Sequence, residues 1–575
     1  MTPRLKAPLV FLLSLAVGAL LLQALQPNRE DPKLDPSAQA AGDPQPGHVY
    51  TGVAEEPDSL NPFTTTSAVA RRYVLAFTHD TLLDVDPISG ASRNALAERA
   101  EVHADGMGMD VTIRDGVTFS DGAQLSIDDV LWTFECARGE GVVLGSLASG
   151  MAQCSGAERI EGAPRSLRIR FATPHFAAMR TVGESWVVTQ KAWMQRAIAD
   201  AAARDGTPAP TPRDPSFGAM LARVTHSPGP GTGPYRLLDD ASGRPGWRRG
   251  VDLTVVQNET SWRRGDPSLW SFAAIRVRFL SDAALRFAAL KKRELDWCTG
   301  ADLAAQLRAD AGLANDYQRL VYDMPTLGAY VVQWNVRKEP LKDARVRRAL
   351  GMLFDRRGIA DTIFGGAASP AAAFLKPQSD GMPDGLAPLP FDIDAARALL
   401  VDANVARADA PMPLQLLVPV EAPWFRRMGE LMASAGQKAG VAVELIALPF
   451  AELVRRRDSG LFDGAMLLVS MPAFGDPYEL FHSGGARNAG GFADAEVDAL
   501  LAAQRNERDQ KARASLLQRA HLRLAELQPC ALIVHPLAEV LVDARLLGAA
   551  PGPLGLWPER MSMPPAFWRR WAARD

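Results

Sequence analysis

Residues 111–135, VTIRDGVTFSDGAQLSIDDVLWTFE, decide the fold of the region around them. Two Asp-Gly pairs, at 115–116 and 121–122, have the chemistry of tight turns, and apolar and polar residues alternate just before each pair. Ser126 and Asp129 have the spacing of a capping box, so we expect a helix to begin there. The stretch therefore predicts two short strands, two turns and a helix. It contains no reactive side chain.

The bulk composition is that of a soluble globular protein. The chain has 575 residues, of which 47% are hydrophobic and 22% are charged, and its net charge is -3. The length predicts two or three units with their own cores, and the charge gives no support for a nucleic-acid partner. The four cysteines form no C-x-x-C pair, which argues against structural zinc, whereas an even number in an exported chain is compatible with disulfides.

The N-terminus indicates export. Arg4 and Lys6 precede an uncharged, mainly apolar run, so residues 1–28 are either a signal peptide or a membrane anchor. Both alternatives stay open, because the one possible cleavage site, at 38–40, lies well beyond the apolar run. The basic residues before the run place the body of the protein outside the cytoplasm. Residues 29–47 are rich in Pro, Asp, Gln and Ala and are predicted to be a disordered tether.

Motifs of catalytic chemistry are missing from the sequence. None of the eight histidines belongs to H-E-x-x-H, and there is no G-x-S-x-G. The glycine-rich run 228–235, PGPGTGPY, lacks the Lys-Ser/Thr of a P-loop and reads as a turn before a strand. The sequence leaves open whether two distant carboxylates meet in a cleft, as they do in glycosidases. We expect no catalytic residue, no metal and no cofactor.

The run at 111–135 resembles the signature of the family 5 extracellular solute-binding proteins, the dipeptide-, oligopeptide- and nickel-binding subunits of ABC importers. Four further matches follow in the family's order, at 228–235, 258–297, 335–356 and 475–498. The resemblance implies an α/β, two-lobed periplasmic-binding-protein fold of type II. It implies the large cluster with an extra subdomain, mixed sheets flanked by helices, and a hinge between the lobes.

The match at 335–356 includes a helix that can be read in physical terms. Asp343 is expected to cap it, and its apolar face is formed by Val346, Ala349, Leu350 and Leu353. Its three arginines, Arg345, Arg347 and Arg348, are predicted to lie mainly on the solvated outer side.

The resemblance also implies domain boundaries. Lobe I is expected at 48–299, with a subdomain at about 84–224, and again after the return of the chain at 530–575. Lobe II is expected at 300–529. We favour one disulfide between Cys136 and Cys154, which bracket a loop and whose bridge would contribute about 3 kcal/mol by chain entropy. Crossing segments in such folds run side by side, which implies a second bridge between Cys298 and Cys530.

By resemblance, the ligand is held by loops that face the cleft between the lobes. The candidate ligand-binding residues are Asn61, Phe63, Tyr330, Trp424, Met471, Ala473 and Asp476. Peptide binders of the family carry an acidic residue at the place of Ala473, where it pairs with the peptide's α-ammonium group. Asp476 is either its substitute or a structural turn residue. Without that carboxylate an ordinary free dipeptide is a doubtful ligand, and a modified or longer peptide is favoured.

The resemblance implies the substrate-binding protein of an ABC-type importer. It would capture a peptide or peptide-like solute between the lobes and deliver it to a permease and ATPase complex in the inner membrane. We expect a monomer in the periplasm or another extracytoplasmic space, either secreted or held by an N-terminal membrane anchor. The alternatives are a hydrolase with a similar cleft, and an anchored sensor or chaperone that uses the same fold.

Overall fold

The computed structural model describes most of the chain beyond residue 46. The described residues are 47–568, without 66, 87–89, 143–153, 175–176, 178–182, 184–185, 239–244, 265, 267–270, 300–309, 325–327, 378, 407–409, 471–474, 553–554 and 559–560. The predicted signal or anchor segment and the tether lie outside them. A search of the described part for a helix long and apolar enough to cross a membrane finds none.

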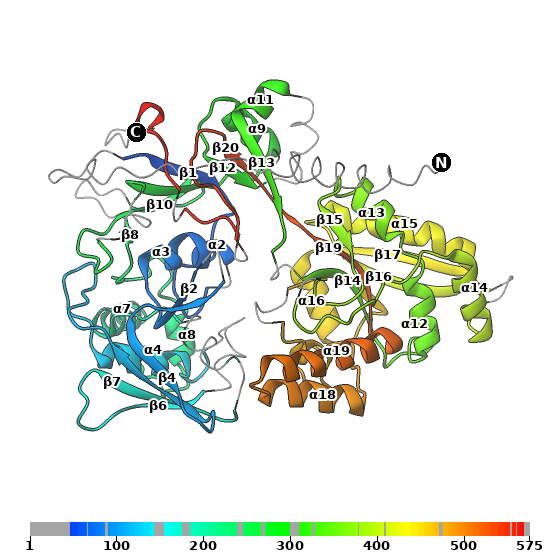
Figure 1. The fold of residues 1–575 in the computed structure, drawn as a ribbon, viewed down its shortest axis with the longest axis horizontal. Coiled ribbons are helices and arrows are strands. Elements are labelled where there is room, and N and C mark those ends of the chain that lie inside the picture. The colour runs from blue at the N-terminus through cyan, green and yellow to red at the C-terminus, as the bar shows by residue number, and fades with distance from the viewer. Residues whose placement is uncertain are drawn as a thin grey trace, which may run out of the picture. The chain divides into compact units, whose positions relative to one another are not determined.

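The first lobe is built on an eight-stranded mixed sheet (Figure 1). Its order is β13 (Tyr317–Tyr322), β20 (Ala538–Asp543), β12 (Trp297–Thr299), β1 (Val49–Val53), β11 (Ala274–Arg278), β10 (Asp252–Gln257) and β8 (Tyr235–Leu237), with β9 (Trp247–Arg248) beside β10. The central strand β1 is parallel to both of its neighbours and every one of its residues is buried. Such a strand, buried on both faces, needs apolar or fully bonded residues throughout.

A buried carboxylate holds the start of β1 in place. The side chain of Asp296 contacts His48 Nε2 at 2.8 Å and accepts a hydrogen bond from Thr51 N at 2.6 Å. The side chains of His48 and Asp296 are fully buried, so this pair depends on mutual hydrogen bonding for its stability. It fixes β1 against β12, which carries Trp297.

The stretch that decides the subdomain folds as predicted at its helix. Helix α4 (Ile127–Ala137) begins with the Ser126–Asp129 capping box, so that prediction is confirmed. The other carboxylate oxygen of Asp129 accepts a hydrogen bond from Lys191 N at the start of α7 (Lys191–Arg204). One side chain therefore begins one helix and joins it to a second.

Beside these helices lies a four-stranded sheet, ordered β4 (Ala97–Val102), β5 (Gly108–Ile113), β7 (Ser166–Phe171) and β6 (Cys154–Arg159). The strand predicted at 117–119 is reduced to a single bridge between Thr118 and Gln124. The reason is local pairing: Leu125 N donates to Val117 O, which folds this stretch back on itself and keeps it out of the sheet. The short pair β2 (Leu83–Val85) and β3 (Ser92–Asn94), and helix α8 (Phe217–Leu221), complete this region.

The second lobe is built on a six-stranded sheet. Its order is β15 (Ala368–Pro370), β19 (Cys530–Pro536), β14 (Ala329–Trp334), β18 (Gly464–Val469), β16 (Met412–Pro419) and β17 (Val441–Leu448). Helices α12 (Ala344–Gly351), α13 (Arg356–Thr362), α14 (Ile393–Asp402), α15 (Pro423–Ala439) and α16 (Phe450–Asp458), with α17 (Tyr478–Phe481), α18 (Ala495–Asn506) and α19 (Gln510–Leu527), accompany it.

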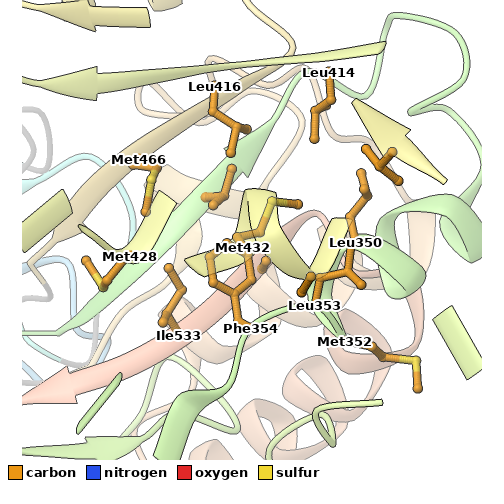
Figure 2. Packing of buried hydrophobic residues seen from close by; sticks show 14 of the residues in the cluster. Leu350, Met352, Leu353, Phe354, Leu414, Leu416, Met428, Met432, Met466 and Ile533 are labelled. Atoms are coloured by element: carbon orange, nitrogen blue, oxygen red, sulfur yellow. The ribbon is translucent and has the colours of Figure 1, made fainter. Parts of the chain in front are cut away.

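One core cluster of this lobe is rich in leucine and methionine. Figure 2 shows Leu350 and Phe354 near the end of α12, Leu416 on β16 and Met432 on α15 converging on one apolar region. Each of these four side chains is almost completely buried. Removing their apolar surface from water stabilises the lobe by about 25 cal/mol per Å² buried.

The expected lobe boundaries stay a prediction, and the sheets show where the strands next to them belong. Strand β13, which follows residue 299, belongs to the first sheet. Strand β19, which begins at 530, belongs to the second sheet, and β20 belongs to the first. The outward crossing segment is thus 323–328, and a single residue, Leu537, separates β19 from β20 on the way back.

The same topology corrects the disulfide expected between Cys298 and Cys530. Cys298 pairs with Leu541 on β20, whereas Cys530 pairs with Gln333 in the other sheet. The structure forms no bridge between Cys298 and Cys530. Cys136 and Cys154 lie in one core cluster as thiols, and the structure forms no bond between them.

The side chain of Arg347 corrects the expected position of the three arginines on α12. Arg345 and Arg348 are exposed, but Arg347 is buried. Its guanidinium donates hydrogen bonds to four carbonyl oxygens, at Leu341, Lys342, Leu527 and Gln528. Two of these carbonyls lie at the end of α19, where a cation is favoured. Arg347 therefore joins the start of α12 to the end of α19.

Two side chains of the second lobe hold the crossing segments. Lys376, which is 4% exposed, forms an ion pair with Asp323 and donates to Met324 O at 3.0 Å and to Pro536 O at 3.4 Å. His535 Nδ1 donates to Gly328 O at 2.8 Å. Both contacts connect the outward crossing with the return strand.

Candidate functional site

An aromatic cavity of about 250 Å³ lies in the first lobe, next to the crossing segments. Its lining is drawn from both ends of the chain: Tyr50, Arg72, Tyr73, Phe77, Ile275, Trp297, Thr299, Tyr322, Met324, Ala538, Glu539, Val540, Leu556 and Pro558. We call this site the aromatic cavity. It contains five aromatic residues and two charged ones.

Trp297 forms one wall of the aromatic cavity. Its ring stacks on Tyr73, with ring centroids 4.8 Å apart and the planes inclined by 20°. An added Cβ at Gly52 would come within 1.7 Å of the indole ring. Gly52 is therefore required for the close approach of the indole to β1.

Arg72 contributes a positive charge to the wall. It lies on a short π-helical turn, Arg71–Leu75, and its Nη2 donates to Leu556 O at 2.9 Å. The guanidinium lies over the rings of Tyr73 and Trp557 at 5.6 and 5.5 Å, in the range of cation–π contacts. Gly555, at φ +99°, leaves room for it, because a Cβ there would come within 2.4 Å of Nη2.

Two buried donors in the lining have no acceptor. Among the residues that the structure describes, neither Nε of Arg72 nor Nε1 of Trp297 has a hydrogen-bond partner. A buried donor left without a partner costs about 1–3 kcal/mol. Burial also raises the pKa of Tyr73 above its ordinary value, so its hydroxyl stays protonated at neutral pH and can donate.

Glu539, the other charged residue of the lining, is already neutralised. Its two carboxylate oxygens accept hydrogen bonds from Arg319 Nε at 2.8 Å and Nη2 at 3.1 Å. The same contact raises the pKa of Arg319. The cavity therefore carries the charge of Arg72 and a set of donors, with no free carboxylate in the described lining.

Two of the predicted ligand-binding residues come together in the second lobe. Tyr330 stacks on Phe364 at 5.3 Å and meets Phe425 edge-on at 5.2 Å, and Trp424 stacks on Phe425. Burial raises the pKa of Tyr330 to about 12. The group is an aromatic cluster on β14 and α15, in which Tyr330 is buried and Trp424 is partly exposed.

Asn61 and Phe63 lie together, and their contacts hold their own loop in place. Asn61 is 1% exposed, donates from Nδ2 to Leu221 O at 2.8 Å, and accepts from Phe63 N at 2.9 Å. Phe63 is part of the subdomain core. With its amide group bonded on both sides, Asn61 fixes the loop against α8, and neither residue lines the aromatic cavity.

Asp476 has the bonding pattern of a structural turn residue. Its Oδ1 accepts from Gln504 Nε2 at 2.7 Å and from Tyr478 N at 3.0 Å, and its Oδ2 accepts from Arg505 Nε at 2.7 Å. Met471 and Ala473 lie outside the described residues. A role of Asp476 toward ligand would require it to give up one of these partners.

The residues that line the aromatic cavity were not found from the sequence. Trp297 stands at the end of a family motif in the sequence, and no motif singles out Arg72 or Tyr73. The one available signal was Gly52 in the centre of an apolar strand, since such a glycine indicates the close approach of another group. Within the described residues, no three His, Cys, Asp or Glu side chains are grouped so that they could hold a metal ion.

Two α/β lobes joined by two crossing segments, with an aromatic cavity beside them, define a two-lobed solute-binding protein. The family model "Bacterial extracellular solute-binding proteins, family 5 Middle" matches residues 92–491. Since the match covers more than half of the sequence, the chain belongs to this family.

The sequence identity to individual members and solved structures is low. The chain is similar to Di/tripeptide-binding protein 2 of Pseudomonas aeruginosa, with 27% identity over 53% of this chain and 56% of that protein. It thus spans about half the length of such curated relatives. Its fold is similar to the oligopeptide-binding protein AppA of Bacillus subtilis in complex with a nonapeptide, with a TM-score of 0.71, 18% identity, and 90% and 99% of the two chains covered. HbpA2 of Haemophilus parasuis has a TM-score of 0.72, 20% identity, and the same coverage.

Proposed function

We propose that this protein is the substrate-binding protein of an ABC-type importer. It captures a peptide or peptide-like solute between its lobes and delivers it to a permease and ATPase complex in the membrane. The single observation that carries the proposal is membership of the family 5 solute-binding proteins over residues 92–491. The named di- and tripeptide-binding relative and the fold it shares with a nonapeptide complex support the peptide class.

The architecture supports capture by hinge motion. A single residue, Leu537, connects β19 of the second lobe with β20 of the first, and a short connection of this kind can absorb the backbone rotation when a ligand is enclosed. We propose that the aromatic cavity contributes the first-lobe part of the binding site and that the Tyr330–Trp424 cluster contributes the second-lobe part. Residues 1–28 then serve as the export signal or the membrane anchor.

The direct test is to identify what the protein carries. The protein is purified under non-denaturing conditions, and any bound solute is released and analysed by mass spectrometry. A receptor is expected to release an intact peptide or peptide-like compound and to change its tryptophan fluorescence when that compound is added back, without consuming it. Conversion of the compound into products would contradict the proposal and favour a hydrolase.

A further inference from the structure

The aromatic cavity has one positive charge, that of Arg72, which no carboxylate of the described residues compensates. Of its two charged residues, Glu539 is bonded through both oxygens to Arg319, while Arg72 has no carboxylate within ion-pair distance in the part of the chain that the structure describes. Arg72 is held by a single carbonyl bond and by two rings. A partly buried guanidinium without a counter-charge favours the arrival of an anion.

The donors of the cavity lack acceptors in the same way. Trp297 is 3% exposed, its Nε1 has no partner among the described residues, and Nε of Arg72 is likewise unpartnered. Among the described residues, the hydroxyl of Tyr50 makes only a long contact of 4.0 Å, with Met561 Sδ. A ligand that brings oxygen acceptors would satisfy several of these groups at once.

The remaining lining sets the size and character of the ligand group. The rings of Tyr50, Tyr73, Phe77, Trp297 and Tyr322 provide apolar surface suited to an aromatic or aliphatic body. A volume of about 250 Å³ is smaller than the roughly 300–1,000 Å³ of pockets that enclose whole drug-sized ligands. The cavity therefore suits one end of a solute.

We infer that the aromatic cavity binds a carboxylate carried on an apolar or aromatic body, so that the transported solutes are anionic at this end. The inference rests on the proposed function and names its class of solute. A carboxylate fits the single positive charge of Arg72 better than a doubly charged phosphate does. Aromatic rings also attract cations, but Arg72 already occupies the cation position over Tyr73, and it repels an ammonium group.

The test compares probes that share the leucyl-phenylalanine body and differ in the charge of their termini. N-acetyl-leucyl-phenylalanine, its C-terminal amide, and the cationic leucyl-phenylalanine amide are titrated into the full-length protein by calorimetry. The acid is expected to bind at least ten-fold more tightly than the neutral amide, and the cationic amide is expected to bind most weakly. Equal affinity for acid and amide, preference for the cation, or no binding of the acid would each overturn the inference.

Variants then locate the effect. Arg72→Met is expected to weaken acid binding at least ten-fold and amide binding less than two-fold, with Arg72→Lys in between. Trp297→Phe keeps the ring but removes Nε1, and is expected to weaken acid binding several-fold. Arg249→Met is the matched control, because Arg249 lies 3.6 Å from the ring of Trp247 outside the cavity.

The outcomes separate this inference from the proposed function. If Arg72→Met weakens acid and amide equally, or leaves acid binding unchanged while thermal melting shows a folded protein, the carboxylate assignment is wrong. The receptor proposal would survive that result, provided that the probes bind and are recovered unchanged. Conversion of the probes into products would contradict the receptor proposal itself.

Discussion

Gly52 is the residue on which the geometry of the aromatic cavity depends most directly. Gly52→Ala is expected to lower the free energy of unfolding by 3 kcal/mol or more, because the new Cβ would overlap the indole ring of Trp297 by well over 1 Å. The substitution is also expected to displace Trp297 and to weaken ligand binding. Chemical denaturation followed by tryptophan fluorescence measures the first effect, and calorimetry measures the second.

Gly156→Ala is the matched control for that change. Gly156 also lies in a strand, β6, but a Cβ there meets no atom within 4 Å. Its free energy of unfolding should change by less than about 1 kcal/mol, since only the backbone preference of the residue is altered. Similar losses in the two variants would mean that Trp297 does not pack closely against Gly52.

The buried histidine His521 makes stability depend on pH. Its Nδ1 donates to Leu517 O at 2.8 Å, and burial lowers its pKa from the ordinary 6.5 to about 4. Between these pH values the unfolded state binds more protons than the folded state, so stability is full above pH 6.5 and falls as the pH is lowered toward 4. The loss is about 3 kcal/mol for a shift of this size.

His521→Leu is therefore expected to flatten the fall of the unfolding free energy between pH 6.5 and 4. Urea denaturation at a series of pH values measures the slope. The exposed His226, replaced by leucine in the same way, serves as the control for the substitution itself. His79, whose pKa burial also lowers to about 4, accounts for part of the remaining slope. An unchanged slope in His521→Leu would show that this histidine is protonated in the folded state.

The roles of individual residues were the hardest feature to predict from the sequence. Asn61 and Asp476 were expected near ligand because the family places them on loops, and both turn out to bond their own surroundings. Arg72 was not expected near ligand, because nothing in its neighbouring sequence indicates that it packs against Gly555 and bonds to Leu556. Contacts between positions almost 500 residues apart leave no trace in local patterns.

At the scale of secondary structure, Arg347 joins two helices that are distant in sequence. Arg347→Lys is expected to lower the free energy of unfolding by about 2–4 kcal/mol, because a single ammonium group cannot reproduce the hydrogen bonds of a planar guanidinium to four carbonyls. Thermal and urea denaturation measure the change.

The neighbouring Arg348→Lys is the control for this helix. Arg348 is exposed, and the same exchange on a solvated face should change stability by less than about 0.5 kcal/mol. If the two variants were equally stable, the bonds of Arg347 to the end of α19 would contribute nothing to folding.

Helices whose first residue is a recognisable capping residue were predicted well, whereas the short strand at 117–119, which has no such signal, was not. The capping box of Ser126 and Asp129 and the cap of Asp343 are confirmed at the starts of α4 and α12. The alternation at 117–119 was misleading, because three alternating residues do not reveal whether their partner is a sheet or their own turn. Arg347 was misplaced for a similar reason, since the helical periodicity of α12 cannot show that another helix covers part of the side expected to face solvent.

At the scale of the whole molecule, Lys376 connects both crossing segments. Lys376→Met is expected to destabilise the protein by about 2 kcal/mol, since Asp323 and the carbonyls of Met324 and Pro536 lose their shared donor. Amide hydrogen exchange is expected to rise at least ten-fold in 328–329 and 535–538, and much less in the cores of the two lobes.

Lys342→Met provides the comparison. Lys342 is exposed and pairs with Glu339 on the surface, so its removal should leave exchange at the crossings unchanged. A uniform rise in exchange across Lys376→Met would show that Lys376 stabilises the fold in general and not the crossings in particular.

The two-lobed architecture could be predicted from the order of the family motifs, but the positions of the crossings could not. The motif ending at Trp297 suggested that the first lobe ends there, yet β13 follows it and joins the same sheet through β20. Which sheet a short strand joins depends on partners elsewhere in the chain. The disulfide expected between Cys298 and Cys530 is not formed in the structure.

The place of β20 in its sheet has a consequence for synthesis. The strand lies between β12 and β13, and β13 has no other neighbour among the described strands of the sheet. A chain emerging from the ribosome presents β13 and then the entire second lobe before residues 538–543 become available. The sheet of the second lobe can thus be complete while the sheet of the first lobe still lacks its strand β20. A chain truncated just before residue 538 would have a complete second sheet and a first sheet in which the facing edges of β12 and β13 are unpaired.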